Sequence, residues 1–120
     1  MASIIIAEDE AGVREFVSRA LAMDGHDVTV AEDGLEALDR LGQARYDLLL
    51  TDIVMPGMNG RELYKRLVVT RPDLKVIYTS GYTDNVITHR GVLDDGIEFL
   101  QKPISASILA RKVREVLDYT

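Results

Sequence analysis

One aspartate, Asp52, stands two residues after a short apolar run at 48–50 and precedes a turn that contains one proline and two glycines. An apolar run of this length suits a strand that is buried on both faces. In open α/β sheets, ligands bind beyond the carboxyl ends of the strands. We therefore expect Asp52 to lie at the functional edge of a sheet.

Polar side chains also follow three of the other apolar runs: Glu8 and Asp9, Ser80, and Lys102. Because the carboxyl ends of parallel strands share one edge, these residues should meet Asp52 there. Clustered carboxylates repel one another and need a cation. Oxygen ligands without histidine or cysteine favour Mg²⁺, which takes one or two carboxylates and keeps several waters. The expected site is therefore a magnesium site.

Lys102 and Ser80 add groups to this edge that can bind phosphoryl oxygens. The ammonium of Lys102 is a compact positive charge that suits a phosphoryl oxygen or a carboxylate, and the Ser80 hydroxyl can donate to the same oxygens. An aspartate facing a metal, an ammonium and a hydroxyl is equipped to accept a phosphoryl group as an acyl phosphate. Taken singly, the acids are ordinary surface residues and Ser80 is a turn residue; their convergence favours the functional interpretation.

Five apolar runs lie at 4–6, 28–30, 48–50, 76–78 and 97–100, and segments of helical spacing lie between them. Strands that alternate with helices predict parallel βα units, and right-handed crossovers place helices on both faces of the sheet. We predict an α/β three-layer sandwich with a parallel five-stranded sheet, as a single domain over residues 1–120.

Four apolar stripes are expected to bury one face of each helix: Val13, Phe16, Val17, Ala20 and Leu21; Leu35, Leu38 and Leu41; Leu63, Leu67 and Val68; Leu109, Val113, Val116 and Leu117. Asp33 and Ser105 should cap the second and last helices, and Gly25 should end the first. The segment 83–96 is the least clear, with a short helix expected near its start and a loop at 91–96.

Composition narrows the class of protein. Hydrophobic residues make up 47% and charged residues 28%, which is typical of a soluble globular domain rather than of disorder. The net charge of −6 argues against direct nucleic-acid binding, and the absence of cysteine excludes disulfides and thiolate sites. The N-terminal residues predict neither a signal peptide nor a membrane span, so we expect a cytoplasmic protein. His26 and His89 are isolated and are expected to be solvated.

Four motifs carry a resemblance to response-regulator receiver domains, the phosphorylatable modules of two-component signalling. They are Ala-Glu-Asp-Glu at 7–10, Leu-Thr-Asp-Ile-Val-Met-Pro-Gly-Met-Asn-Gly at 50–60, Thr-Ser-Gly at 79–81 and Leu-Gln-Lys-Pro at 100–103. The resemblance covers essentially the whole chain. It implies a flavodoxin-like (βα)5 fold with strand order 2-1-3-4-5.

The same resemblance implies roles for the metal residues. Asp52 is expected to be the phosphoacceptor. Asp9 should bind Mg²⁺ directly and Glu8 mostly through water, with the backbone carbonyl of Val54 as a further ligand.

For the switch, the resemblance implies that Lys102 and Ser80 contact the phosphoryl group and that Phe99 is an aromatic rotamer switch. The family often has tyrosine at that position, and phenylalanine offers no hydroxyl to a partner. Ile104 stands where phenylalanine usually follows Lys-Pro. We expect the output surface to comprise 83–90, 97–101 and the outer face of the last helix.

The predicted function is a signalling switch that takes a phosphoryl group from a histidine kinase or a histidine phosphotransfer protein and then changes its surface for a downstream partner. It is expected to be a monomer or a phosphorylation-dependent dimer and, beyond its own phosphotransfer and autodephosphorylation, not an enzyme. The stretch 80–84 resembles receivers of hybrid histidine kinases, so the chain is a candidate piece of one. No DNA-binding segment follows Thr120, so a transcription factor is not expected.

Two alternatives remain. A Mg²⁺-dependent phosphohydrolase with an aspartyl-phosphate intermediate usually has a second acid two residues after the nucleophile, where this chain has Val54. A pure interaction module without phosphorylation is disfavoured by the intact Asp9, Asp52 and Lys102.

Overall fold

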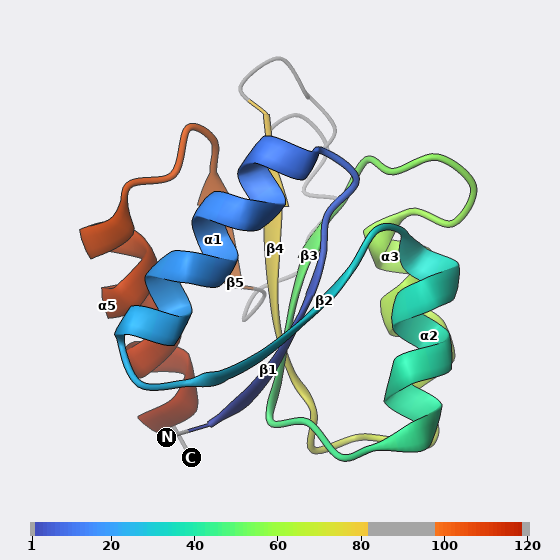
Figure 1. Ribbon diagram of the computed structural model, residues 1–120. Coiled ribbons are helices and arrows are strands. Elements are labelled where there is room, and N and C mark those ends of the chain that lie inside the picture. The colour runs from blue at the N-terminus through green and yellow to red at the C-terminus, as the bar shows by residue number, and fades with distance from the viewer. Residues whose placement is uncertain (1, 82–97, 119–120) are drawn as a thin grey trace.

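Strands and helices alternate along the chain in the computed structural model, which describes residues 2–81 and 98–118 (Figure 1). The elements are β1 Ser3–Ala7, α1 Ala11–Met23, β2 Asp27–Ala31, α2 Gly34–Gln43, β3 Leu48–Asp52, α3 Gly60–Val68, β4 Lys75–Ser80, β5 Glu98–Gln101 and α5 Ala106–Asp118. The helix and loop expected within 83–96 lie outside the described residues. No helix in the described part of the chain is long and apolar enough to cross a membrane.

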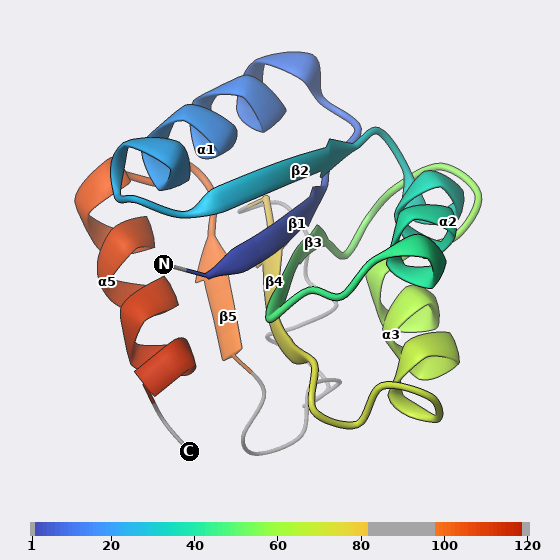
Figure 2. The ribbon, with the colours of Figure 1, turned by 60° about the horizontal axis from the view of Figure 1, so that its bottom comes forward.

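The five strands form one parallel sheet in the order β2-β1-β3-β4-β5. Helices α1 and α5 cover one face and α2 and α3 the other, which Figure 2 shows with the sheet between the two layers. The predicted α/β fold of flavodoxin-like topology is confirmed. All the strands run in the same direction, so their carboxyl ends gather at one edge, where the candidate site residues are expected.

Two apolar clusters form the core, one on each face of the sheet. In β1, Ile4 and Ile6 pack toward the α1 and α5 side, while Ile5 packs toward the α2 and α3 side. In β3, Leu48 and Leu50 alternate with Leu49 in the same way, because successive side chains of a strand point to opposite faces. Each fully buried Leu or Ile contributes roughly 1.5–3 kcal/mol of transfer free energy. The central strands are therefore rigid supports for the residues at their ends.

Three of the helix ends expected from the sequence are confirmed. The Asp33 side chain accepts a hydrogen bond from the Glu36 amide at 2.8 Å, and the Ser105 hydroxyl accepts one from the Ile108 amide at 3.2 Å. Gly25 follows α1 with a φ of 93°, a conformation that glycine adopts without strain. The cap of α3 was not among the predictions: the Asn59 side chain accepts from the Glu62 amide at 2.8 Å.

Three expectations about burial were wrong. Phe16 is 43% exposed and Leu35 is 62% exposed, because each lies at the margin of an apolar stripe that is wider than the face its helix buries. The His26 side chain is only 9% exposed rather than solvated, since the turn after α1 packs it against the start of β1. There its Nδ1 accepts a hydrogen bond from the Ala2 amide at 3.3 Å. His89 lies outside the described residues.

Candidate functional site

The ends of β1, β3 and β4 bring the predicted site residues together. Asp52 is the last residue of β3 and lies in register with Thr79 of β4. Glu8 directly follows β1, and its amide donates to the Ala31 carbonyl at 3.1 Å. Lys102 is held at the end of β4, because its amide donates to the Ser80 carbonyl at 2.8 Å. Backbone pairing therefore places these residues at one edge.

Lys102 bridges the carboxylates at this edge. Its Nζ lies 2.9 Å from Asp52 Oδ2, 3.0 Å from Glu8 Oε1 and 3.9 Å from Glu10 Oε1. The side chains of Lys102, Asp52 and Glu8 are 14%, 6% and 4% exposed. Because little water reaches these charges, their interactions are screened much less than those of surface pairs.

The carboxylates of Glu8, Asp9 and Asp52 form a cluster in which one oxygen from each lies within 4.8 Å of the others. Glu8 and Asp52 are buried, while Asp9 is exposed and faces solvent. A set of hard oxygen ligands with one side open to water fits Mg²⁺, which binds through few carboxylates and retains water. The Val54 amide donates to Asp52 Oδ1 at 3.3 Å.

Burial raises the pKa of both Glu8 and Asp52 above their ordinary values. Hydrogen bonds from Lys102 oppose this shift, while the Asp52 charge raises the pKa of Glu8 further, and Asp9 does the same to Asp52. Burial alone lowers the pKa of Lys102, but its hydrogen bonds to Asp52 and Glu8 outweigh burial and raise it. One ammonium is therefore shared between two buried carboxylates, whose pKa values stay raised by burial.

The loop after β3 turns sharply at two glycines. The Ile53 amide donates to the Thr79 carbonyl at 3.0 Å, and the Gly60 amide donates back to the Ile53 carbonyl at 2.9 Å. A Cβ on Gly60 would lie 2.4 Å from the carbonyl oxygen of Asp52, which excludes a side chain there. Gly57 has a φ of 80°. This close approach returns the chain to α3 and holds the Asp52 backbone in place.

Ser80 and Phe99 lie on one face of the sheet. Ser80 ends β4 and is buried; its Oγ lies 3.4 Å from the Gly81 carbonyl, to which it donates. Phe99 of β5 is half-buried and in register with Tyr78, two residues before Ser80, so the three side chains share a face. The ring of Tyr78 packs edge-on against that of Tyr64 in α3, with centroids 6.4 Å apart. Burial raises the pKa of Tyr78 to about 12.

Two residues at the site were missed by the sequence interpretation. Glu10 adds a third carboxylate near Lys102, and the Nη1 of Arg14 donates to the carbonyl oxygen of Glu8 at 2.8 Å. The run of acids at 8–10 could have drawn attention to Glu10. Nothing in the sequence pattern distinguishes Arg14 from an ordinary helix-surface arginine.

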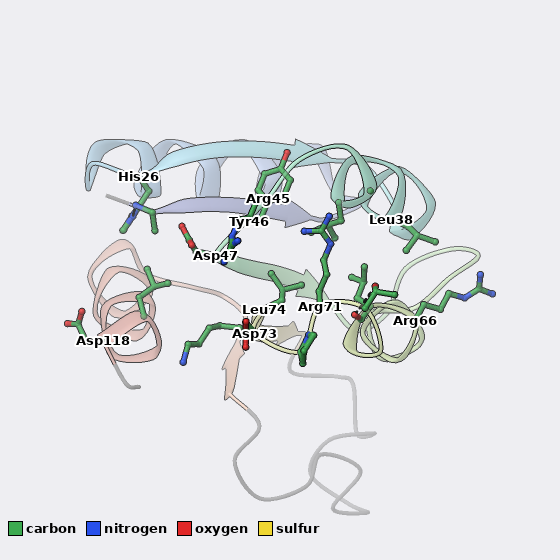
Figure 3. Close-up of a pocket in the computed structure, with 18 of the residues that line it drawn as sticks. His26, Leu38, Arg45, Tyr46, Asp47, Arg66, Arg71, Asp73, Leu74 and Asp118 are labelled. Atoms are coloured by element: carbon green, nitrogen blue, oxygen red, sulfur yellow. Dashed lines mark hydrogen bonds between the residues drawn. The ribbon is translucent and has the colours of Figure 1, made fainter.

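A wide hollow of about 1200 Å³ lies at the opposite end of the sheet, where the strands begin. Figure 3 shows His26, Tyr46, Asp47 and Arg71 around it. None of the predicted site residues lines it. One of its charged lining residues, Arg66, pairs with Glu62 on the surface of α3 at 3.5 Å. The position of the hollow therefore does not coincide with the buried charges.

Comparisons with known proteins agree with this arrangement. Residues 4–114 match the family model described as response regulator receiver domain. The chain is 37% identical over 119 residues to the sensor kinase CckA of Brucella abortus, covering 98% of this chain and 13% of that protein. It is 34% identical to the response regulator receiver protein CpdR of the same organism, covering 98% of both. The solved structure of Vibrio cholerae chemotaxis protein CheY4 superposes with a TM-score of 0.86 at 27% identity, covering 97% of this chain and 98% of that one.

Proposed function

Because this chain belongs to the family of response regulator receiver domains, a module of two-component signalling, we propose that it is a phosphoacceptor switch whose phosphorylated residue is Asp52. The observation that carries the proposal is the placement of Asp52, which is 5% exposed at the end of β3 and bonded to Lys102, with the other carboxylates beside it. We propose that the whole of 1–120 acts as one such domain.

In the proposed reaction, a carboxylate oxygen of Asp52 attacks the phosphorus of a phosphohistidine. An oxygen–phosphorus bond forms, the phosphorus–nitrogen bond breaks, and the imidazole nitrogen leaves with the electron pair. The product is an acyl phosphate on Asp52. Before phosphorylation, Lys102 pairs with Asp52 and Glu8. After it, the same ammonium is positioned to donate charge-assisted hydrogen bonds, which are strong, to the phosphoryl oxygens.

Asp9 and Asp52 are the proposed direct ligands of Mg²⁺, with Glu8 acting mostly through water and the Val54 carbonyl completing the protein ligands. When bound, Mg²⁺ neutralises charge on the phosphoryl oxygens and orients them. The geometry supports this assignment, since one oxygen from each of Glu8, Asp9 and Asp52 lies within 4.8 Å of the others and the exposed Asp9 leaves one side open to water.

The phosphoryl donor is proposed to be a histidine kinase or a histidine phosphotransfer protein. The similarity to a sensor kinase supports this partner class, and the chain spans 13% of the length of that relative. The similarity to a receiver protein of matching length supports the same chemistry in a separate protein.

Phosphorylation with a small donor tests the proposal. Incubation with phosphoramidate and Mg²⁺ should add one phosphate by intact mass, and Asp52→Asn should add none. Asp73→Asn, an exposed aspartate at the other edge of the sheet, is the matched control and should be labelled like the wild type. Equal labelling of Asp52→Asn would show that the phosphoacceptor lies elsewhere.

We further propose that Ser80 and Phe99 transmit the change. Their shared face supports this, because a Ser80 hydroxyl that moves toward the phosphoryl group vacates space beside Phe99, and packed cores favour two discrete arrangements. Beryllofluoride should then shift the amide signals of β5 and α5 as well as those around Asp52. Shifts confined to the loops around Asp9 and Asp52 would contradict this coupling. The expected output segment at 83–90 lies outside the described residues.

A further inference from the structure

We infer that Arg14 is a positioning residue for the magnesium site, acting through the peptide that joins Glu8 to Asp9. The inference rests on the proposed function of this site and adds a residue that neither the motifs nor the comparisons assign. Arg14 touches neither a carboxylate oxygen of the cluster nor Asp52 in the hydrogen bonds described, so its action is on the backbone that carries the ligands.

Arg14 holds the acidic loop at two points. Its side chain, half-buried in the first turn of α1, donates from Nη1 to the Glu8 carbonyl oxygen at 2.8 Å. Its own amide donates to the Glu10 carbonyl at 2.9 Å, as the first turn of the helix requires. One residue of α1 therefore fixes both ends of the loop 8–10 relative to the helix.

The rest of the loop is held on the Glu8 side. The Glu8 amide donates to Ala31, and the Glu10 amide donates to Glu8 Oε2 at 3.1 Å. Asp9 is exposed, so the position of its carboxylate is set by the backbone rather than by side-chain packing. Rotation of the peptide between Glu8 and Asp9 would move both ligands at once, and the bond from Arg14 opposes that rotation.

Electrostatics explain why a tether is needed here. Glu8, Asp9, Glu10 and Asp52 lie together, and their mutual repulsion favours opening of the loop when no cation is bound. A guanidinium stays protonated at any working pH and makes a charge-assisted hydrogen bond, which is about twice as strong as a neutral one. Arg14 therefore keeps the ligands close enough to capture a weakly bound cation.

The experiment measures Mg²⁺ affinity of the unphosphorylated protein by amide chemical shifts, and then the Mg²⁺ dependence of phosphorylation by phosphoramidate. Arg14→Met keeps the apolar stem but removes the donor, and should raise the Mg²⁺ concentration for half-saturation about tenfold. The phosphorylation rate at saturating Mg²⁺ should stay within about twofold of the wild type. Arg14→Lys keeps a donor without the planar guanidinium, so its Mg²⁺ concentration for half-saturation should lie between those of the wild type and Arg14→Met.

Arg19→Met, an exposed arginine of the same helix, is the matched control and should behave like the wild type. In the metal-free protein, Arg14→Met should also shift the Asp9 amide nitrogen, which shares a peptide with the accepting carbonyl. Unchanged Mg²⁺ half-saturation in Arg14→Met, or an equal loss in Arg19→Met, would overturn the inference. The Mg²⁺ titration needs no phosphorylation, so it distinguishes this failure from a failure of Asp52 to accept phosphate.

Discussion

The sheet has a carboxyl edge, where its parallel strands end, and an amino edge, where they begin. Both carry acidic and basic side chains, but in different environments. At the carboxyl edge, the ammonium of Lys102 is 14% exposed and lies between Asp52 and Glu8, which are nearly buried. At the amino edge, Arg114 pairs with Asp24 while its side chain remains 63% exposed. The amino edge also has the wide hollow (Figure 3).

This difference shows that the size of a hollow is a poor guide to chemistry in this fold. Moving a charge out of water is costly, so a cluster of buried charges persists only where something else maintains it. The carboxyl edge retains such a cluster, with carboxyl pKa values raised by burial. At the amino edge, Arg114 pairs with an Asp24 side chain that is 20% exposed, but its own guanidinium stays in solvent, so the attraction between the two charges is screened by water.

The largest expected difference between the edges is in the response to magnesium. Asp9→Ala removes a proposed magnesium ligand from the carboxylate cluster and should lower the rate of phosphorylation by phosphoramidate at least about a hundredfold. Asp73→Ala removes another exposed aspartate, at the amino edge, and should leave the rate unchanged. Rates are followed by intact mass at several Mg²⁺ concentrations. A wild-type rate for Asp9→Ala would place the metal elsewhere.

A smaller difference is expected in the cost of losing one cation from each edge. Lys102→Met leaves two buried carboxylates without their partner and should lower the free energy of unfolding by about 3 kcal/mol at pH 7. Arg114→Met removes a cation that is 63% exposed and should cost less than about 1 kcal/mol. Urea unfolding measures both.

The stability contribution of Lys102 should also depend on pH in a defined direction. Its pKa is raised in the folded state, so its contribution is complete below its ordinary value of 10.5 and is lost as the pH rises through the folded value. If Lys102→Met and Arg114→Met instead lower the free energy of unfolding equally at pH 7, the energetic distinction between the two edges is wrong.

The smallest expected effect is a gain in stability when the charge of Asp52 is removed. Because burial raises the pKa of Asp52, its charged form is less favourable in the folded protein than in the unfolded chain. Asp52→Asn should therefore raise the free energy of unfolding by about 1 kcal/mol at pH 7, with Asp73→Asn unchanged within about 0.5 kcal/mol.

The pH dependence checks this assignment. As the pH falls through the folded pKa of Asp52 toward its ordinary value of 3.8, the wild-type carboxyl becomes protonated and the gap between the two proteins should close. A gap that persists or widens at low pH would mean that Asp52→Asn stabilises by packing rather than by removing a buried charge.

The sequence pattern alone was sufficient for a parallel five-stranded α/β sandwich, for the placement of Glu8, Asp9, Asp52 and Lys102, and for the caps at Asp33 and Ser105, while the strand order came from the resemblance to receiver domains. Strand periodicity and cap chemistry are local properties, and the parallel topology then carries the strand ends to one edge whatever the details of packing. The four motifs added the roles of these residues.

Only the tertiary structure decided which side chains are buried at the margins and which contacts surround the site. Phe16 and Leu35 lie in apolar stripes but are exposed, whereas His26 looked solvated and is nearly buried. Burial at a margin depends on where a helix crosses the sheet and on which turn folds over it, and no local pattern encodes either.

Arg14 is the clearest case of what only the folded chain determines. Its six-residue separation from Glu8 makes no regular helix or strand contact, and the bond forms because the loop at 8–10 reverses the chain over the first turn of α1. The chemical type of each side chain in the site follows from the residues themselves. The distances between these side chains follow from packing, because repulsion among their carboxylates is balanced by the ammonium of Lys102 and by backbone hydrogen bonds contributed from other parts of the fold.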